Sequence, residues 1–119
     1  MSLIVYGIPN CSTVKKARAW LEEQGAAYTF HDYKKLGVPA ERLDAWIAAA
    51  GWEKLLNRQG TTWRKLDEAT REGVTDAASA KAVMLTQASV IKRPVIELDG
   101  RVLAVGFDEA RAQAVAAAL

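Results

Sequence analysis

The sequence predicts an α/β protein in which a four-stranded mixed sheet is interrupted by a helical insertion between its second and third strands. Three observations support this architecture. An apolar segment, Leu3–Tyr6, is followed by a helix pattern and then a second strand pattern, an order typical of a parallel β-α-β unit. The segment from about 39 to 89 shows helix patterns and no strand pattern. Two β-rich segments, 95–98 and 102–105, flank Asp99-Gly100, which is a strong hairpin signal.

The first strand leads into the part of the sequence with the strongest chemical signal. Leu3–Tyr6 is apolar and contains β-branched residues, which fits a strand buried on both faces. Gly7 and Pro9 mark the loop after it, and Cys11, the only cysteine, follows. Three polar neighbours of the cysteine are plausible caps for the next helix: Asn10, Ser12 and Thr13. We therefore expect Cys11 at or just before a helix N-terminus.

A helix and a second strand are predicted after the cysteine. The segment 13–24 has an apolar stripe at helical spacing, and Gly25 stands where a glycine would end the helix. The segment 27–33 alternates between two faces, as a strand does, and contains His31. We expect His31 at the sheet edge or on the surface, because nothing beyond its presence supports a role as the base for Cys11.

The middle of the chain is predicted to be helical. Pro39 suits the first turn of a helix over 39–50. A shorter helical turn at 52–56 and a polar loop follow, and Asp76 is predicted to cap a further helix that ends near position 88.

The chain is predicted to close with the hairpin and a last helix. Pro94 opens the strand 95–98, where proline is tolerated, and Asp108 can cap the final helix. The order β-α-β, helices, β-β-α is that of the thioredoxin-like fold. In that fold a cysteine follows the first strand and faces a cis proline that opens the third strand and leaves a backbone edge open to a peptide-like thiol. Pro94 occupies this position in the order, so we expect it in the substrate- or glutathione-binding site. We therefore expect a single thioredoxin-like domain over 1–119.

Cys11 is predicted to be a reactive thiol. At a helix N-terminus, unpaired backbone N–H groups and the positive end of the helix dipole favour the thiolate over the thiol. Lys15 lies one turn further along the same face, so its ammonium group could add to this effect. The alternative interpretation is a free cysteine that packs as a small apolar side chain.

The composition excludes several classes of protein. Half of the 119 residues are hydrophobic and the net charge is +2, which is too balanced to indicate direct nucleic-acid binding. The sequence has no apolar segment long enough to span a bilayer and no signal peptide, so we expect a cytoplasmic protein. We expect a monomer, because the chain is small and shows no obvious exposed apolar stripe. One cysteine excludes an internal disulfide, and with one histidine no structural zinc site is expected.

Three separated motifs stand in register along the chain. They are YGIPNCSTVKKA at 6–17, GTTWRKL at 60–66, and IKRPV at 91–95 together with VGF at 105–107. These motifs resemble the ArsC/Spx family, most closely its YffB-like branch. The resemblance covers essentially the whole chain and implies an ArsC/Spx-type domain with the helical insertion in place.

The resemblance implies roles for particular residues. In arsenate-reducing members, the thiol at the position of Cys11 attacks the oxyanion, arginines bind the oxyanion, and glutathione and glutaredoxin resolve the adduct. This implies anion binding by Arg93, which lies beside Pro94, and by Arg58, where the match slips by one residue. With the helix N-terminus, three residues would stabilise the thiolate and a bound anion: Asn10, Ser12 and Thr13. Lys15 would supply a further cation.

The sequence also departs from the arsenate-reducing pattern. Those enzymes carry a histidine at the position of Gly7, an arginine at that of Lys15, and a third site arginine at that of Phe107. Each charge-assisted contact is worth about 1.5–3 kcal/mol, so losing a cation weakens oxyanion binding. A glutathione-dependent thiol reductase, as proposed for the YffB-like branch, therefore fits better than arsenate reduction. Glutathione would be a co-substrate, with no bound cofactor.

Two other cysteine chemistries lack a residue that they need, and one role without chemistry stays open. A dithiol mechanism needs a second cysteine at the position of Val14, so any turnover must use an external thiol. A cysteine phosphatase would need an arginine at the position of Ala17. A partner-binding role without chemistry stays open, because Spx-like relatives bind RNA polymerase, although this chain lacks the second cysteine of their redox switch.

Overall fold

The computed structural model describes residues 2–119, which form two compact units. One unit runs to Gly37 and resumes at Arg93, and the other is Val38–Lys92. The second unit corresponds to the helical insertion expected at about 39–89. No helix among the described residues is both long enough and apolar enough to cross a membrane.

The first unit contains a four-stranded mixed sheet with the strand order β2-β1-β3-β4. Its strands are β1 (Leu3–Gly7), β2 (Thr29–Asp32), β3 (Val95–Leu98) and β4 (Arg101–Val105). β1 pairs in parallel with β2 and antiparallel with β3, and β3 and β4 form an antiparallel hairpin. The predicted sheet, its β-α-β start and its closing hairpin are therefore confirmed.

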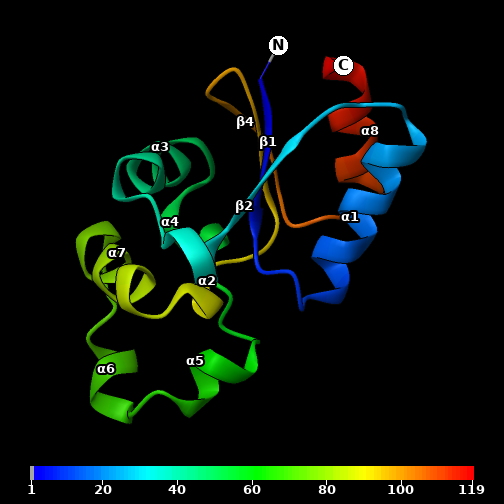
Figure 1. Ribbon diagram of the computed structural model, residues 1–119. Coiled ribbons are helices and arrows are strands. Elements are labelled where there is room, and N and C mark those ends of the chain that lie inside the picture. Colours follow the sequence, from blue (N-terminus) through cyan, green and yellow to red (C-terminus); the bar gives the residue numbers. More distant parts are fainter. Residues whose placement is uncertain (1) are drawn as a thin grey trace. The chain divides into compact units, whose positions relative to one another are not determined.

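Two helices, α1 (Ser12–Glu23) and α8 (Glu109–Ala118), lie on the same face of this sheet (Figure 1). Apolar side chains from the two helices and from three strands form the core between them, because burying such surface stabilises the fold by about 25 cal/mol per Å². The buried members of this core are Leu3, Val5, Ala17, Leu21, Ile96, Leu98, Ala104 and Val115.

The hairpin turn has the geometry that its sequence predicts. Asp99 and Gly100 both have positive φ angles, 51° and 81°, as a type I′ turn requires. The Asp108 side chain accepts a hydrogen bond of 2.9 Å from the backbone N–H of Arg111, so the predicted cap of α8 is confirmed.

The second strand is shorter than predicted. We expected a strand over 27–33, but β2 ends at Asp32, and Tyr33 begins a short helix, α2 (Tyr33–Leu36). The cause is local: the Asp32 side chain accepts a hydrogen bond of 2.9 Å from the N–H of Lys34, which caps α2. In the sequence, the strand-like alternation between two faces continues through Tyr33, whereas the backbone changes from strand to helix after Asp32.

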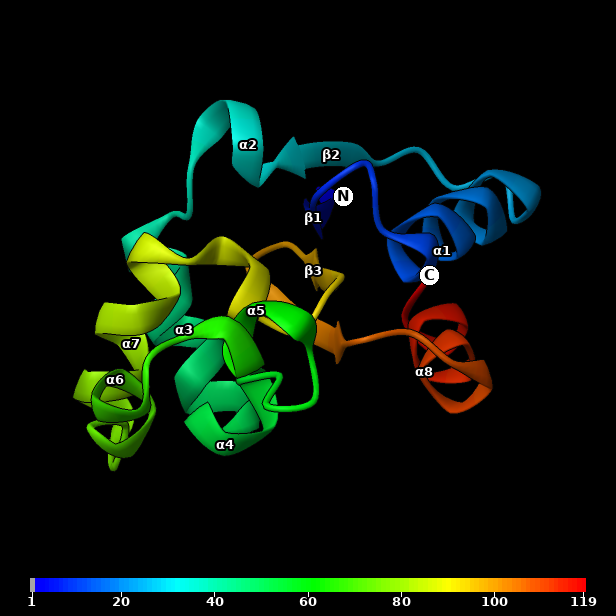
Figure 2. The ribbon, with the colours of Figure 1, turned by 90° about the horizontal axis from the view of Figure 1, so that it is seen from below.

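The second unit is helical, as predicted. Figure 2 shows three of its helices, α3, α4 and α7, close together. In the described part of this unit, the only β-type pairing is an isolated bridge between Leu56 and Ile91. Asp76 caps α7 through a capping box with Ser79, which confirms the prediction. The helices are α3 (Ala40–Ala50), α4 (Trp52–Leu55), α5 (Thr61–Lys65), α6 (Glu68–Glu72), α7 (Ala77–Thr86) and the 3₁₀ helix η1 (Ala88–Val90).

Candidate functional site

Cys11 is the N-cap residue of α1. Its backbone is extended (φ −111°, ψ 126°), and its carbonyl oxygen accepts a hydrogen bond of 2.9 Å from the N–H of Lys15. The expected place of Cys11 at a helix N-terminus is confirmed. The expectation that a polar neighbour caps the helix is wrong, because Ser12 is already the first helical residue and the cysteine itself occupies the cap.

The Cys11 thiol is partly buried, and its pKa lies below the ordinary value for a cysteine. Burial is the largest single effect and would by itself raise this pKa. The backbone N–H groups of Val14 and Thr13 and the side chain of Arg93 act in the opposite direction and together outweigh burial. The sulfur accepts no hydrogen bond of standard capping geometry, so the two N–H groups stabilise the thiolate by the weak hydrogen bonds typical of sulfur.

Arg93 and Pro94 form the second part of the site. The Arg93–Pro94 peptide bond is cis, as expected for the proline that opens the third strand. The Pro94 carbonyl accepts a hydrogen bond of 2.8 Å from the N–H of Gly106, which ties this turn to the end of β4. The Arg93 side chain is half-buried, with a fully buried Nε, and it hydrogen-bonds to the sulfur of Cys11 and attracts it by its charge.

The other predicted site residues are described by their exposure and by the unit to which they belong. Asn10 and Ser12 are exposed beside the cysteine. Lys15 is also exposed, and it is not among the groups in residues 2–119 that lower the pKa of Cys11. Arg58 belongs to the second unit, where its guanidinium carbon lies 5.3 Å from the centre of the Trp52 ring.

A buried polar cluster that the sequence does not predict lies in the first unit. The Tyr6 hydroxyl donates a 2.9 Å hydrogen bond to Oε1 of Glu97, and both side chains are almost fully buried. His31 lies in the edge strand β2, as predicted, with its ring centre 5.0 Å from that of Tyr6 and 6.0 Å from that of Tyr33. The available signal was a single carboxylate within the apolar strand that follows Pro94.

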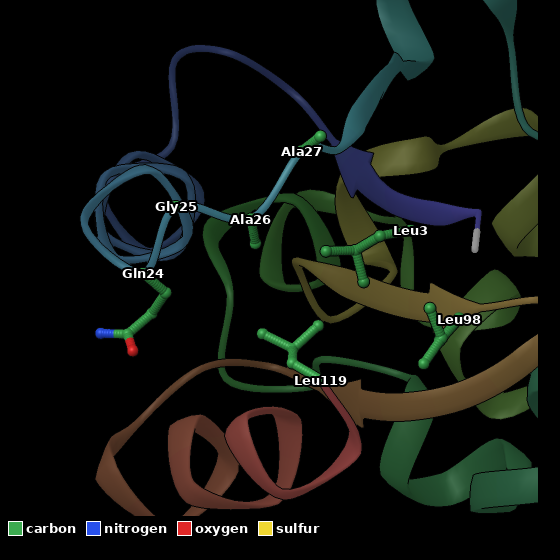
Figure 3. Close-up of a pocket in the computed structure, with 7 residues that line it drawn as sticks. All are labelled: Leu3, Gln24, Gly25, Ala26, Ala27, Leu98 and Leu119. Atoms are coloured by element: carbon green, nitrogen blue, oxygen red, sulfur yellow. The ribbon is translucent and has the colours of Figure 1, made fainter.

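Within the described residues, neither a metal-binding cluster nor the pocket of the first unit involves the predicted site residues. Among residues 2–119, no group of three or more His, Cys, Asp or Glu side chains could hold a metal ion. A pocket of about 330 Å³ lies where β1 begins, at the end of the strand away from Cys11 (Figure 3). None of the predicted site residues lines it. Its walls are Leu3, Gln24, Gly25, Ala26, Ala27, Leu98 and Leu119.

The chain is similar to known proteins over nearly its whole length. A family model described as "ArsC family" matches residues 6–115. The solved structure of a protein named YffB is 52% identical, covers 99% of both chains and has a TM-score of 0.90. An arsenate reductase (ArsC) related protein from Brucella melitensis is 56% identical over 96% of this chain and 93% of that chain, with a TM-score of 0.74.

Two curated relatives are also similar. An uncharacterized protein of Haemophilus influenzae is 40% identical over 112 residues, which are 94% of this chain and 96% of the relative. The global transcriptional regulator Spx of Streptococcus agalactiae is 27% identical over 103 residues, which are 85% of this chain and 73% of the regulator. Together with the observed sheet order, the structural similarities confirm the predicted thioredoxin-like fold.

Proposed function

The chain belongs to the ArsC family, and on this premise we propose that it is a glutathione-dependent thiol reductase that acts through one cysteine, Cys11. The observation that carries the proposal is the state of this thiol. Cys11 caps α1, is partly exposed, and has a pKa below the ordinary value. The thiolate is the form of cysteine that attacks sulfur, so a lowered pKa raises the fraction of Cys11 that is a nucleophile at any pH below the range in which an ordinary cysteine titrates.

The proposed substrate is a mixed disulfide between glutathione and another thiol. The Cys11 thiolate attacks the glutathione sulfur, a new S–S bond forms, and the other sulfur leaves as a thiolate that takes a proton from water. A second glutathione thiolate then attacks the bound glutathione sulfur and releases glutathione disulfide and the Cys11 thiolate. This external thiol is required because the sequence contains no second cysteine to resolve the adduct.

The neighbours of Cys11 have distinct roles in this reaction. Arg93 stabilises negative charge on the Cys11 sulfur, both before attack and when that sulfur leaves again. A guanidinium also suits the carboxylates of glutathione, which it binds in a bidentate manner. Asn10 and Ser12 offer exposed polar groups beside the sulfur, and Lys15 offers a nearby cation for the same ligand.

Arsenate reduction is the second candidate, favoured by the 56% identity to a protein described as arsenate reductase related. Two features of the chain weigh against it. Phe107, where arsenate-reducing members carry an arginine, packs against Trp20 with ring centres 5.7 Å apart. Gly7, where they carry a histidine, faces Val14 so closely that a side chain cannot fit without a shift of Val14. The thiol reductase therefore has more support.

The test combines intact mass with turnover. We expect incubation with glutathione disulfide to add one glutathionyl group to the wild-type protein and none to Cys11→Ser. With glutathione as reductant, we expect turnover of a small glutathione mixed disulfide to exceed that of arsenate, and to be lost in Cys11→Ser. No adduct, or equal turnover in the serine variant, would contradict the proposal.

The same variant separates chemistry from docking. The Spx relative is named as a global transcriptional regulator. If this protein is a regulator that binds a partner without chemistry, Cys11→Ser would keep its regulatory effect, since a serine preserves the local shape. If the protein acts as a reductase, Cys11→Ser abolishes that effect, because the oxygen of serine does not form a disulfide.

A further inference from the structure

A carboxylate is buried in β3, on the face of the sheet opposite α1 and α8. Glu97 is 1% exposed. It alternates with Ile96 and Leu98, whose side chains belong to the core under the two helices, so Glu97 points to the other face. Burying a charged carboxylate destabilises the fold unless the group is paired and hydrogen-bonded. The groups around Glu97 therefore indicate its role.

The first neighbour of Glu97 comes from β1. In the register of the two strands, Tyr6 lies opposite Val95, which makes Tyr6 and Glu97 diagonal neighbours on one face. Tyr6 is 4% exposed, and its hydroxyl donates to Oε1 of Glu97 at 2.9 Å. This hydrogen bond fixes one oxygen of the carboxylate, and a carboxylate can accept hydrogen bonds at both of its oxygens.

The second neighbour comes from the start of α2. Tyr33 is 4% exposed, and its pKa is far above the ordinary value. Burial is the main cause; the electrostatic interactions with Tyr6 and Glu97 act in the same direction, whereas the positive charge of Arg93 acts against them. The Tyr33 phenol therefore stays neutral and lies near both Glu97 and Arg93. The His31 ring, in edge contact with the ring of Tyr33, walls this group on the side of β2.

Arg93 connects this cluster with the sulfur. Its side chain acts on the Cys11 sulfur by a hydrogen bond and by its charge, and its Nε atom is fully buried. A guanidinium has five N–H donors in a rigid plane, so it can bond to groups on two sides at once. A flexible arginine holds one orientation only when acceptors fix it, and Glu97 is the buried acidic side chain on β3, the strand that Pro94 opens.

We infer that Glu97 is a positioning residue: its carboxylate, fixed by the Tyr6 hydroxyl, orients the guanidinium of Arg93 toward the sulfur of Cys11. Glu97 acts through Arg93 and touches neither substrate nor sulfur. The inference rests on the proposed role of Cys11 as the nucleophile. Beyond that role, Glu97 is the residue that keeps the guanidinium of Arg93 in place.

The direction in which the alkylation midpoint of Cys11 shifts separates two roles of Glu97: positioning of Arg93, and a direct effect of its own negative charge. Glu97→Gln keeps the shape and the acceptor for Tyr6 but removes the negative charge. If Glu97 acted only by its own charge, removing it would stabilise the thiolate and lower the pH at which Cys11 is half-maximally alkylated. If Glu97 positions Arg93, its removal loosens the cation and raises that pH, by about one unit if most of the effect of Arg93 is lost.

The experiment is alkylation of Cys11 by iodoacetamide across pH in four proteins: wild type, Glu97→Gln, Arg93→Ala and the double variant. We expect Glu97→Gln to raise the midpoint in the wild-type background and to cause no further rise in the Arg93→Ala background. A midpoint that stays or falls in Glu97→Gln, or an equal rise in both backgrounds, overturns the inference. Ile96→Val, on the opposite face of β3, controls for general weakening of the strand and should leave the midpoint unchanged.

Two features keep the result interpretable. Tyr6→Phe removes the hydrogen bond to Glu97 without removing a buried charge, so it carries the test if Glu97→Gln does not fold; we expect a smaller rise in the midpoint. Alkylation needs no glutathione. A protein that fails to turn over glutathione disulfides can therefore still confirm the positioning role, and an active reductase can still refute it.

Discussion

The Cγ2 methyl of Val14 lies 2.8 Å from the point that a β-carbon on Gly7 would occupy. Gly7 ends β1, and Val14 is fully buried in the first turn of α1. The strand and the helix on either side of Cys11 therefore approach each other as closely as a glycine allows. Valine has one strongly preferred side-chain rotamer in a helix, so Val14 cannot turn aside at low cost.

This contact predicts that Gly7→Ala destabilises the protein by about 1–3 kcal/mol, as overpacking of a core does. Urea unfolding measures the change. Val14→Ala alone should also destabilise, because it leaves a cavity, but the double variant should be more stable than the sum of the two changes predicts. Strict additivity would show that the two side-chain positions do not compete for space.

Arg93 is predicted to hold the Cys11 thiol in its reactive form. Wild-type alkylation should reach half of its maximal rate below about pH 8.5, the ordinary value for cysteine. Removing a cation that stabilises the thiolate raises the pKa, so Arg93→Ala should move the midpoint up by about one unit. Arg101→Ala, which removes an exposed arginine from β4, is the matched control and should leave the midpoint unchanged.

Val14→Cys is predicted to create a dithiol. The backbone N–H of Val14 acts directly on the Cys11 sulfur, so a side chain at this position begins close to that atom. Mild oxidation by a small disulfide should give a monomer without free thiols, whereas the oxidised wild type keeps an adduct until an external thiol removes it. Disulfide-linked dimers as the main product would show that the two sulfurs do not meet within one chain.

The capping box of α7 predicts a pH dependence of stability. The backbone N–H of Ser79, followed by its hydroxyl, lowers the pKa of the exposed Asp76 carboxyl below 3.8. A lowered pKa in the folded state stabilises the fold above the unfolded pKa, and this stabilisation is lost as the pH falls through the folded value.

Urea unfolding of Asp76→Ala should therefore show lower stability than wild type at neutral pH, with the difference shrinking below about pH 4. Asp76→Asn keeps a capping oxygen but does not titrate, so its stability should change less with pH in this range. A difference between wild type and Asp76→Ala that stays constant into acid would rule out the carboxylate as its source.

Much of the fold could be predicted from the sequence because its turns and helix caps are set by neighbouring residues. The Asp99-Gly100 turn and the Asp76 and Asp108 caps each depend on a few neighbouring residues, and each stands where the sequence places it. The short helix α2 was missed because its cap, Asp32, also continues the alternation of a strand. Two local signals competed there, and the sequence offers no energy scale to decide between them.

The site could be predicted only in part. Cys11 at the start of α1 follows from local chemistry, and the cis bond before Pro94 from the order of the elements. The hydrogen bond between Tyr6 and Glu97 joins residues 91 positions apart, and the side-chain alternation of neither strand predicts it. Such buried polar contacts depend on strand register, which becomes visible only in three dimensions.

If Cys11 acts as the proposed nucleophile, a partly exposed thiol with a lowered pKa and no second cysteine in the sequence has a consequence under oxidative stress. Peroxide converts such a sulfur to a sulfenic acid, which a neighbouring cysteine would normally capture as a disulfide. Cys11 has no such neighbour in the 119 residues, so rescue depends on small thiols from outside. When those run short, the same sulfur proceeds to sulfinic acid, and the damage becomes permanent.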